Sequence, residues 1–224
     1  MRKTVVAVAS TIATFAVATP ALAGDFYVYG AVGQSDIGLE KGNLDGFLNK
    51  GLTNAGATNL SSSSSVDNTD TGYKLGVGYQ VTPYVAVEGG YVDLGKTKYS
   101  YNATATQGTA TASGEVKISG VNLSVVGILP VGADFNLFGK VGVLVGQAKA
   151  SYGGTVNAPG IGAWGAGTSG TKNQSAATYG IGASYNLTKE VSLRAEYEWF
   201  DIKGIPATGD PDAKLFSLGV AYKF

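Results

Sequence analysis

The chain has 224 residues, no cysteine and no histidine, and its 16 basic and 16 acidic residues give a formal net charge of zero. Without cysteine it forms no disulfide, without histidine it lacks the commonest general base, and without a basic excess it lacks the footprint of a nucleic-acid-binding protein. Hydrophobic types make up 44% of the chain and glycine 34 residues, which excludes a disordered chain and is typical of one β domain.

The first 23 residues have the pattern of a secretory signal peptide. Arg2 and Lys3 precede an apolar run over 5–17, and an A-x-A cleavage sequence ends at Ala23. The apolar run is shorter than the roughly 20 residues that a membrane-spanning helix needs, which disfavours an N-terminal anchor. We therefore expect a signal peptide over 1–23 and an exported domain over 24–224.

Segments that alternate between apolar and small or polar residues recur along the exported chain. A period of two is the pattern of β-strands with one apolar face, and a length near ten residues suits a strand that crosses a bilayer at a tilt. The predicted strands cover 26–35, 72–81, 84–94, 116–129, 135–147, 177–187, 190–202 and 214–224.

The connections between these strands alternate between long and short. Three long ones, over 36–71, 95–115 and 148–176, are rich in small and polar residues, and we expect mobile polar loops, with the serine run 61–65 as a solvated spacer. A medium connection covers 203–213. Since every other connection lies at the same end, the fold class predicted is all-β, an eight-stranded antiparallel up-and-down transmembrane β-barrel.

In the predicted strands, the charged residues fall on the same alternate positions, that is, the same parity and the same face, as the small residues. Glu88, Lys140, Arg194 and Glu196 therefore face the lumen if the apolar residues face lipid. In a soluble barrel the faces would be exchanged, and strand glycines would stand on the outside, where glycine weakens a strand without benefit. The pattern favours a membrane barrel with ionic groups inside.

Three segments resemble the transmembrane domain of the OmpA family: GYQVTPYVAVEGGYVDLG over 78–95, RAEYEW over 194–199 and SLGVAYKF over 217–224. The resemblance implies an eight-stranded barrel in the bacterial outer membrane. It also implies that Phe224 is the signal read by the outer-membrane assembly machinery.

For the lumen, the same resemblance implies a salt bridge between Glu88 and Arg194 that closes the barrel, with Lys140 and Glu196 in the same ionic network. The family has a further lysine and glutamate with which the pair exchanges partners. Val126 and Ser184 stand at those positions here, and this departure counts against a gate that works by partner exchange.

Other motifs have a plain explanation. The G-x-G-x-x-G sequence over 160–165 lacks a preceding parallel strand and a following helix, so we interpret it as loop flexibility. Metal sites are disfavoured without histidine or cysteine. We expect no enzyme, no catalytic residue, no cofactor and no metal, because no convergent nucleophile and base can be named.

The function expected is a structural or envelope-integrity role in the outer membrane, with at most slight permeability to small solutes. Two alternatives stay open: a surface adhesin or ligand-binding protein that acts through the long extracellular loops, and a narrow porin-like channel. The partners expected are outer-membrane lipid, the assembly machinery, and host surfaces, phage or small solutes at the loops, with no nucleic acid.

Overall fold

The computed structural model describes residues 25–158, 162–202 and 212–224, and side chains within these ranges except those of 162–164. The predicted signal peptide over 1–23 lies outside the described residues. The elements, in chain order, are β1 (Asp25–Ile37), α1 (Lys41–Asn54), β2 (Ser61–Asp67), β3 (Thr69–Thr82), β4 (Val85–Ala105), β5 (Gly108–Pro130), β6 (Phe135–Ala158), β7 (Gly162–Asn186), β8 (Val191–Ile202) and β9 (Asp212–Lys223).

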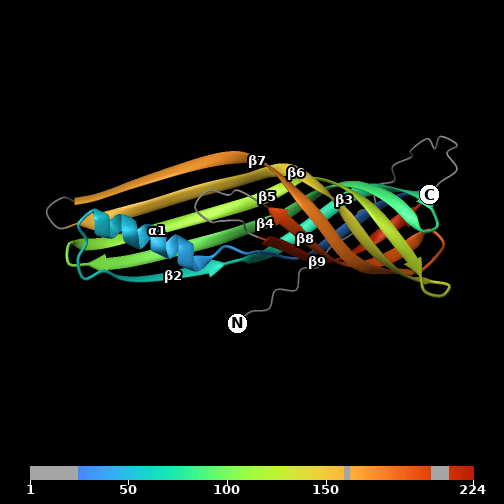
Figure 1. Cartoon of the computed structure of the whole chain (residues 1–224), viewed down its shortest axis with the longest axis horizontal. Helices are drawn as coiled ribbons and strands as arrows, with labels where there is room; N and C mark the ends of the chain where they lie inside the picture. The colour runs from blue at the N-terminus through green and yellow to red at the C-terminus, as the bar shows by residue number, and fades with distance from the viewer. Residues whose placement is uncertain (1–24, 159–161, 203–211) are drawn as a thin grey trace.

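Eight strands close into a ring in the order β4-β3-β1-β9-β8-β7-β6-β5, and β5 returns to β4 (Figure 1). All pairings in the ring are antiparallel. The last strand, β9, lies between β8 and β1, and the amide of Phe224 donates to the carbonyl of Phe26 at 2.9 Å. Closure leaves no unpaired edge in the ring, as a bilayer requires, and the predicted eight-stranded antiparallel barrel is confirmed.

The outer face of the ring is apolar. Alternate residues such as Leu75, Leu123, Val141 and Ile181 are 60–66% exposed, while Glu88 is 1% exposed on the inside. Aromatic rings gather at both ends of this face, in the pairs Tyr73–Tyr91, Tyr179–Trp199, Phe26–Tyr79 and Tyr222–Phe224. Such rings favour the headgroup level of a membrane. Within the described residues, no helix is long and apolar enough to span a membrane.

Glycines inside the ring make room for large lumen side chains. A Cβ on Gly78 would overlap the ring of Tyr27, and one on Gly76 would lie 2.6 Å from the hydroxyl of Tyr29. Both tyrosines come from the neighbouring strand β1, at the register pairs Tyr27↔Gly78 and Tyr29↔Gly76. The facing predicted from parity is therefore confirmed, because these glycines are needed on the crowded side of the sheet.

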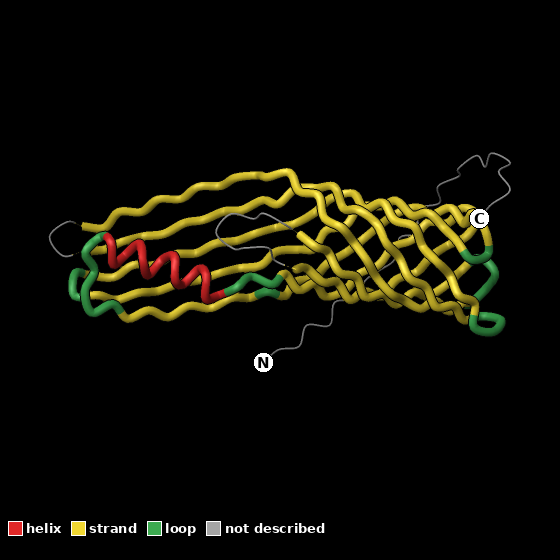
Figure 2. Tube along the Cα trace, in the orientation of Figure 1, coloured by secondary structure: helices red, strands yellow, loops and turns green. Residues whose placement is uncertain are grey.

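Four strands of the ring continue beyond it and, together with β2 and α1, form a structure that we call the extension. The continuing parts are residues 96–105 of β4, 108–117 of β5, 148–158 of β6 and 162–175 of β7. In Figure 2 these strands run side by side away from the crossing strands of the barrel. The sheet order in the extension is β2-β4-β5-β6-β7. A bulge between Asp93 and Lys96, with Gly95 at a φ of +69°, marks where β4 leaves the ring.

The extension corrects the prediction of mobile polar loops. Residues 96–105, 108–115, 148–158 and 162–176 lie in paired strands, and 36–71 holds α1 and β2. Of the glycine motif, Gly162–Gly165 belongs to β7, and 160–161 lie outside the described residues. The serine run 61–65 is largely exposed to solvent, but it is a strand rather than a spacer, because it pairs with 100–104 of β4. These strands are rich in serine, threonine, alanine and glycine, so most of their residues give little of the polarity contrast by which alternation is recognised.

The helix α1 is held by side chains of the extension. Its three glycines, Gly42, Gly46 and Gly51, each disfavour a helix by about 1 kcal/mol relative to alanine. The Tyr99 hydroxyl donates to Asp45 Oδ1 at 2.6 Å, the Ser64 hydroxyl donates to Asp45 Oδ2 at 2.7 Å, and Tyr101 donates to Asn49 at 2.5 Å. Leu44 packs beneath the helix against Tyr99 and Tyr101. Tertiary contacts, rather than propensity, therefore form this helix.

Candidate functional site

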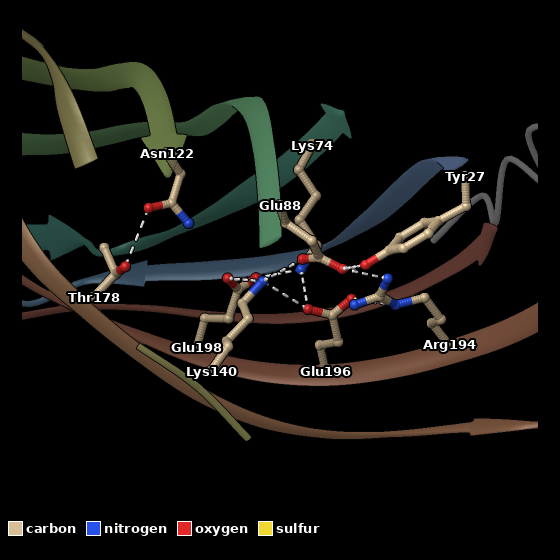
Figure 3. Close-up of polar contacts among 9 residues, drawn as sticks. All are labelled: Tyr27, Lys74, Glu88, Asn122, Lys140, Thr178, Arg194, Glu196 and Glu198. Carbon is tan, nitrogen blue, oxygen red and sulfur yellow. Dashed lines mark hydrogen bonds and ion pairs between the residues drawn. The ribbon is translucent and has the colours of Figure 1, made fainter. Parts of the chain in front are cut away.

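The lumen of the barrel holds six charged side chains that we call the ionic cluster (Figure 3). Parity places all of them on the inner face, and each is at most 8% exposed. Its three cations and three carboxylates come from four strands: Lys74 of β3, Glu88 of β4, Lys140 of β6, and Arg194, Glu196 and Glu198 of β8.

Arg194 and Glu88 connect opposite walls of the lumen. Arg194 Nη1 donates to Glu88 Oε1 at 2.6 Å, and the Tyr27 hydroxyl donates to the same oxygen at 2.7 Å. The guanidinium also lies over the ring of Phe138, 4.7 Å from its centroid. Arg194 Nε forms an ion pair with Glu196 Oε1 at 3.0 Å, without hydrogen-bond geometry. The predicted pairing of Glu88 with Arg194 is confirmed, and its role as plug or gate stays a prediction.

The two lysines join the three carboxylates into one network. Lys140 Nζ lies 2.6 Å from Glu198, 2.9 Å from Glu196 and 3.8 Å from Glu88. Lys74 Nζ lies 2.6 Å from Glu196 and also contacts Glu198. Buried charges are tolerated when they are paired, and three positive groups against three negative ones leave no net charge in the cluster.

Two members of the ionic cluster, Lys74 and Glu198, and its neighbour Tyr27 were not among the predicted site residues. Parity already placed Lys74 and Glu198 on the inner face, so their direction was available from the sequence. Their contact was not, because β3 and β8 are separated in the ring by β1 and β9. Lys74 supplies a second lumen lysine although Val126 stands at the family's lysine position.

An apolar layer closes the lumen beyond the ionic cluster, toward the extension. Its members are at most 5% exposed and come from seven of the eight ring strands. They are Ile37, Val92, Leu94, Val116, Ile118, Leu144, Ala148, Ala176, Phe200, Ile202, Ala213 and Leu215. Between this layer and the cluster, Thr178 donates to Asn122 at 3.1 Å (Figure 3). The lumen is thus sealed by an apolar layer as well as by charges.

A cavity of about 610 Å³ lies at the other end of the barrel, beside the short turns. Its inner wall includes Glu88, Arg194 and Phe138, and its rim includes Pro83 and Lys189. We call it the vestibule. It gives water access to one side of the ionic cluster and ends there. Within the described residues, no group of three or more acidic side chains forms a candidate metal site.

Comparison with known proteins places these features in a family. The model of the OmpA-like transmembrane domain matches residues 21–224. Outer membrane protein A of Salmonella typhi is 29% identical over 226 residues, covering 100% of this chain and 56% of the relative. The Shigella flexneri protein of the same name is 32% identical over 149 residues, 66% of this chain and 38% of the relative. The chain spans about half the length of the first relative.

A solved structure shows the same fold. The crystal structure of Ail, the attachment invasion locus protein of Yersinia pestis, in complex with the heparin analogue sucrose octasulfate, is similar with a TM-score of 0.51 at 17% identity. The similarity covers 91% of this chain and 100% of that one.

Proposed function

This chain belongs to the OmpA-like transmembrane domain family and is a bacterial outer-membrane protein, and on that premise we propose that it is a surface-binding protein whose closed barrel anchors the extension outside the cell. The observation that carries the proposal is the extension itself, a folded sheet with a docked helix in place of flexible loops. The sequence leaves this binding role open as an alternative to the structural role in the envelope.

Orientation supports the proposal. The three short turns, after β3, β5 and β7, lie at the end of the barrel where β1 begins and β9 finishes. Short turns of outer-membrane barrels are periplasmic and long excursions are extracellular. The extension therefore stands on the outer side of the membrane, where it is available to ligands.

The closed lumen supports a binding role over a channel. A solute entering the vestibule meets the ionic cluster, in which every charge is paired, and then the apolar layer. The interior of an eight-stranded barrel is only wide enough for its own side chains to fill. Passage would need both layers to rearrange, so we assign the ionic cluster, including Glu88, Lys140, Arg194 and Glu196, a structural role in closing the barrel.

The ligand of Ail is not carried over to this chain. Two lysines at the base of the extension are already engaged: Lys96 with Glu115 at 3.2 Å and Lys117 with Asp93 at 2.9 Å. The hydrogen bond and the charge of Asp93 also raise the pKa of Lys117. A sulfated ligand would have to compete with these carboxylates, so we place the binding function on other parts of the extension.

An envelope-integrity role is the second candidate, and the balanced ionic cluster favours it. A paired, buried network together with aromatic rings at both membrane surfaces makes the barrel a stable transmembrane element. An envelope role of this kind would rest on the barrel alone and would be independent of the extension.

A trimmed chain separates the two roles. Three cuts at register partners, removing 38–67, 99–114 and 151–169 and closing each with a short turn, leave the ring and the apolar layer intact. In a strain lacking the protein, we expect the trimmed chain to restore detergent resistance but not attachment to cultured epithelial cells. Folding is checked by heat-modifiable gel mobility. Full attachment by the trimmed chain would contradict the binding role.

A further inference from the structure

The extension contains an elongated groove that no part of the described chain fills. Two adjoining cavities, of about 400 Å³ and 260 Å³, lie along the inner face of β5, β6 and β7 beside α1. They share Val116, Tyr152 and Thr168 in their linings, so they adjoin each other, and we call the two together the outer groove. Its size is that of a small-molecule site.

The wall of the outer groove is apolar and partly open to water. The helix covers the half of the sheet formed by β2, β4 and β5, where Tyr99 and Tyr101 are buried. Beside it, Phe47 of α1 is 68% exposed and Tyr152 of β6 is 41% exposed, and both line the groove. Aromatic surface left open in a concave site marks a place where an apolar ligand gains by displacing water.

One buried polar group stands at the barrel end of the groove. Gln174 of β7 lines the second cavity, is 9% exposed, and its Nε2 has no hydrogen-bond partner. Buried amide donors are nearly always paired, because an unpaired one loses its hydration without compensation. This amide is therefore a donor available to a hydrogen-bond acceptor at the end of the groove, where Lys172 and Thr171 also line the cavity.

We propose that the outer groove binds a single-chain amphiphile from the external medium, of the fatty-acid class, with its chain along Phe47 and Tyr152 and its carboxylate at Gln174 Nε2. Three features select this class: an elongated shape, a largely apolar wall, and a polar end where Gln174 Nε2 has no partner and Lys172 also lines the cavity. The floor is closed by Val116 and Ala148 of the apolar layer, so the ligand enters from the outer side. The inference rests on the proposed function, since it identifies the ligand class of the same extension.

The first test blocks the groove where the cavities join. Thr168 lies opposite Tyr152 in the register of β6 and β7, and Thr168→Phe places a ring at the junction. Ser151→Phe, one residue along β6 with its side chain on the opposite face, is the matched control. With the protein in lipid nanodiscs, we expect saturable fluorescence binding of dansyl-undecanoic acid, weakened about tenfold or more by Thr168→Phe and unchanged by Ser151→Phe.

The second test addresses the donor. Gln174→Leu keeps the volume and removes the unpaired amide, so the fold is expected to be retained. Lauric acid should displace the probe from the parent chain about tenfold more effectively than dodecylamine, whose headgroup lacks an acceptor, and Gln174→Leu should remove that preference. Equal displacement by both compounds in the parent chain would overturn the assignment of the donor.

The outcomes separate this inference from the proposed function. Equal probe binding by the parent and by Thr168→Phe, both with native heat-modifiable mobility, means partition into lipid and overturns the groove as the site. If the trimmed chain still loses attachment, the binding role of the extension stands. Conversely, saturable probe binding that is lost in Thr168→Phe supports the groove as a ligand site. If the trimmed chain nevertheless attaches to cells normally, only the binding role at the cell surface is contradicted, and the groove stands.

Discussion

Arg194 of β8 reaches across the lumen to Glu88 of β4, its Nη1 atom 2.6 Å from Oε1, although the two strands lie diametrically opposite in the ring. Tyr27 donates to the same carboxylate oxygen, and the lysines of the ionic cluster surround its other members. The opposite walls of the barrel are thus joined by charge-assisted contacts in addition to the hydrogen bonds between neighbouring strands. The contribution of these contacts can be measured.

Removing one member of the Glu88–Arg194 pair should lower the stability of the barrel. We expect Glu88→Ala to lower the free energy of unfolding by about 3–5 kcal/mol, because it leaves the buried Arg194 with Glu196 as its remaining carboxylate. The double variant Glu88→Ala/Arg194→Ala should cost less than the two single variants together. Urea unfolding of the refolded barrel in detergent, followed by tryptophan fluorescence, measures these values.

The control for the ion pair is at the surface. Lys96 and Glu115 lie 3.2 Å apart with both side chains 42% exposed, so Glu115→Ala should change the free energy of unfolding by less than about 1 kcal/mol. Strict additivity of Glu88→Ala and Arg194→Ala would show that the two groups do not stabilise each other.

Conductance should depend on two layers in series. In planar bilayers we expect the parent chain, Glu88→Ala and Phe200→Ala all to be silent, because each single variant leaves the other layer closed. The double variant Glu88→Ala/Phe200→Ala should show current steps. Steps in Glu88→Ala alone would identify the ionic cluster as the sole barrier and favour a gate.

Docking of α1 should weaken in acid. Partial burial by itself raises the pKa of Asp45, but the hydrogen bonds from Ser64 and Tyr99 outweigh it and hold the pKa below its usual range. A carboxylate whose pKa is lowered in the folded state stabilises that state fully when the pH is above the ordinary aspartate pKa of about 3.9. This contribution is lost as the pH falls through the lowered pKa.

Amide hydrogen exchange in α1, corrected for intrinsic rates, measures this effect. Protection should be constant near neutral pH and fall as Asp45 becomes protonated. In Asp45→Asn, protection at neutral pH should already be reduced and its decrease in acid should be smaller. If α1 were equally protected in the parent chain and in Asp45→Asn at every pH measured, its docking would be due to the packing of Leu44 alone.

Phe224 should matter for assembly more than for stability. Its ring is 50% exposed on the lipid face and packs edge-on against Tyr222, with 5.1 Å between the ring centroids. Its hydrogen bond to the Phe26 carbonyl is donated by the backbone amide and does not involve the side chain. We expect Phe224→Ser to refold in detergent with a loss of less than about 2 kcal/mol, below the full value of a buried aromatic side chain. In cells, the yield of assembled protein should fall several-fold, measured as the heat-modifiable fraction in outer membranes. A normal yield would remove the assembly role.

The sequence by itself determined the ring. Alternation reveals a strand when its two faces meet different surroundings, and lipid against a crowded lumen is a strong difference, so the strand over 190–202 showed Leu193 outside and Arg194 inside. The same contrast placed Glu88, Lys140 and Glu196 in the lumen. Long and short connections then fixed the antiparallel order.

Only the tertiary structure decided the partners of the lumen charges and the form of the extension. Lys74 meets Glu198 because closure of the ring brings β3 and β8 face to face across the lumen, and no local pattern encodes that. In the extension the outer face of the sheet is polar and the inner face is mostly alanine and glycine with a few larger residues such as Tyr99 and Tyr101, so alternation gives only a weak signal there. Backbone pairing and the docking of α1 hold those strands, and both depend on residues far apart in the chain.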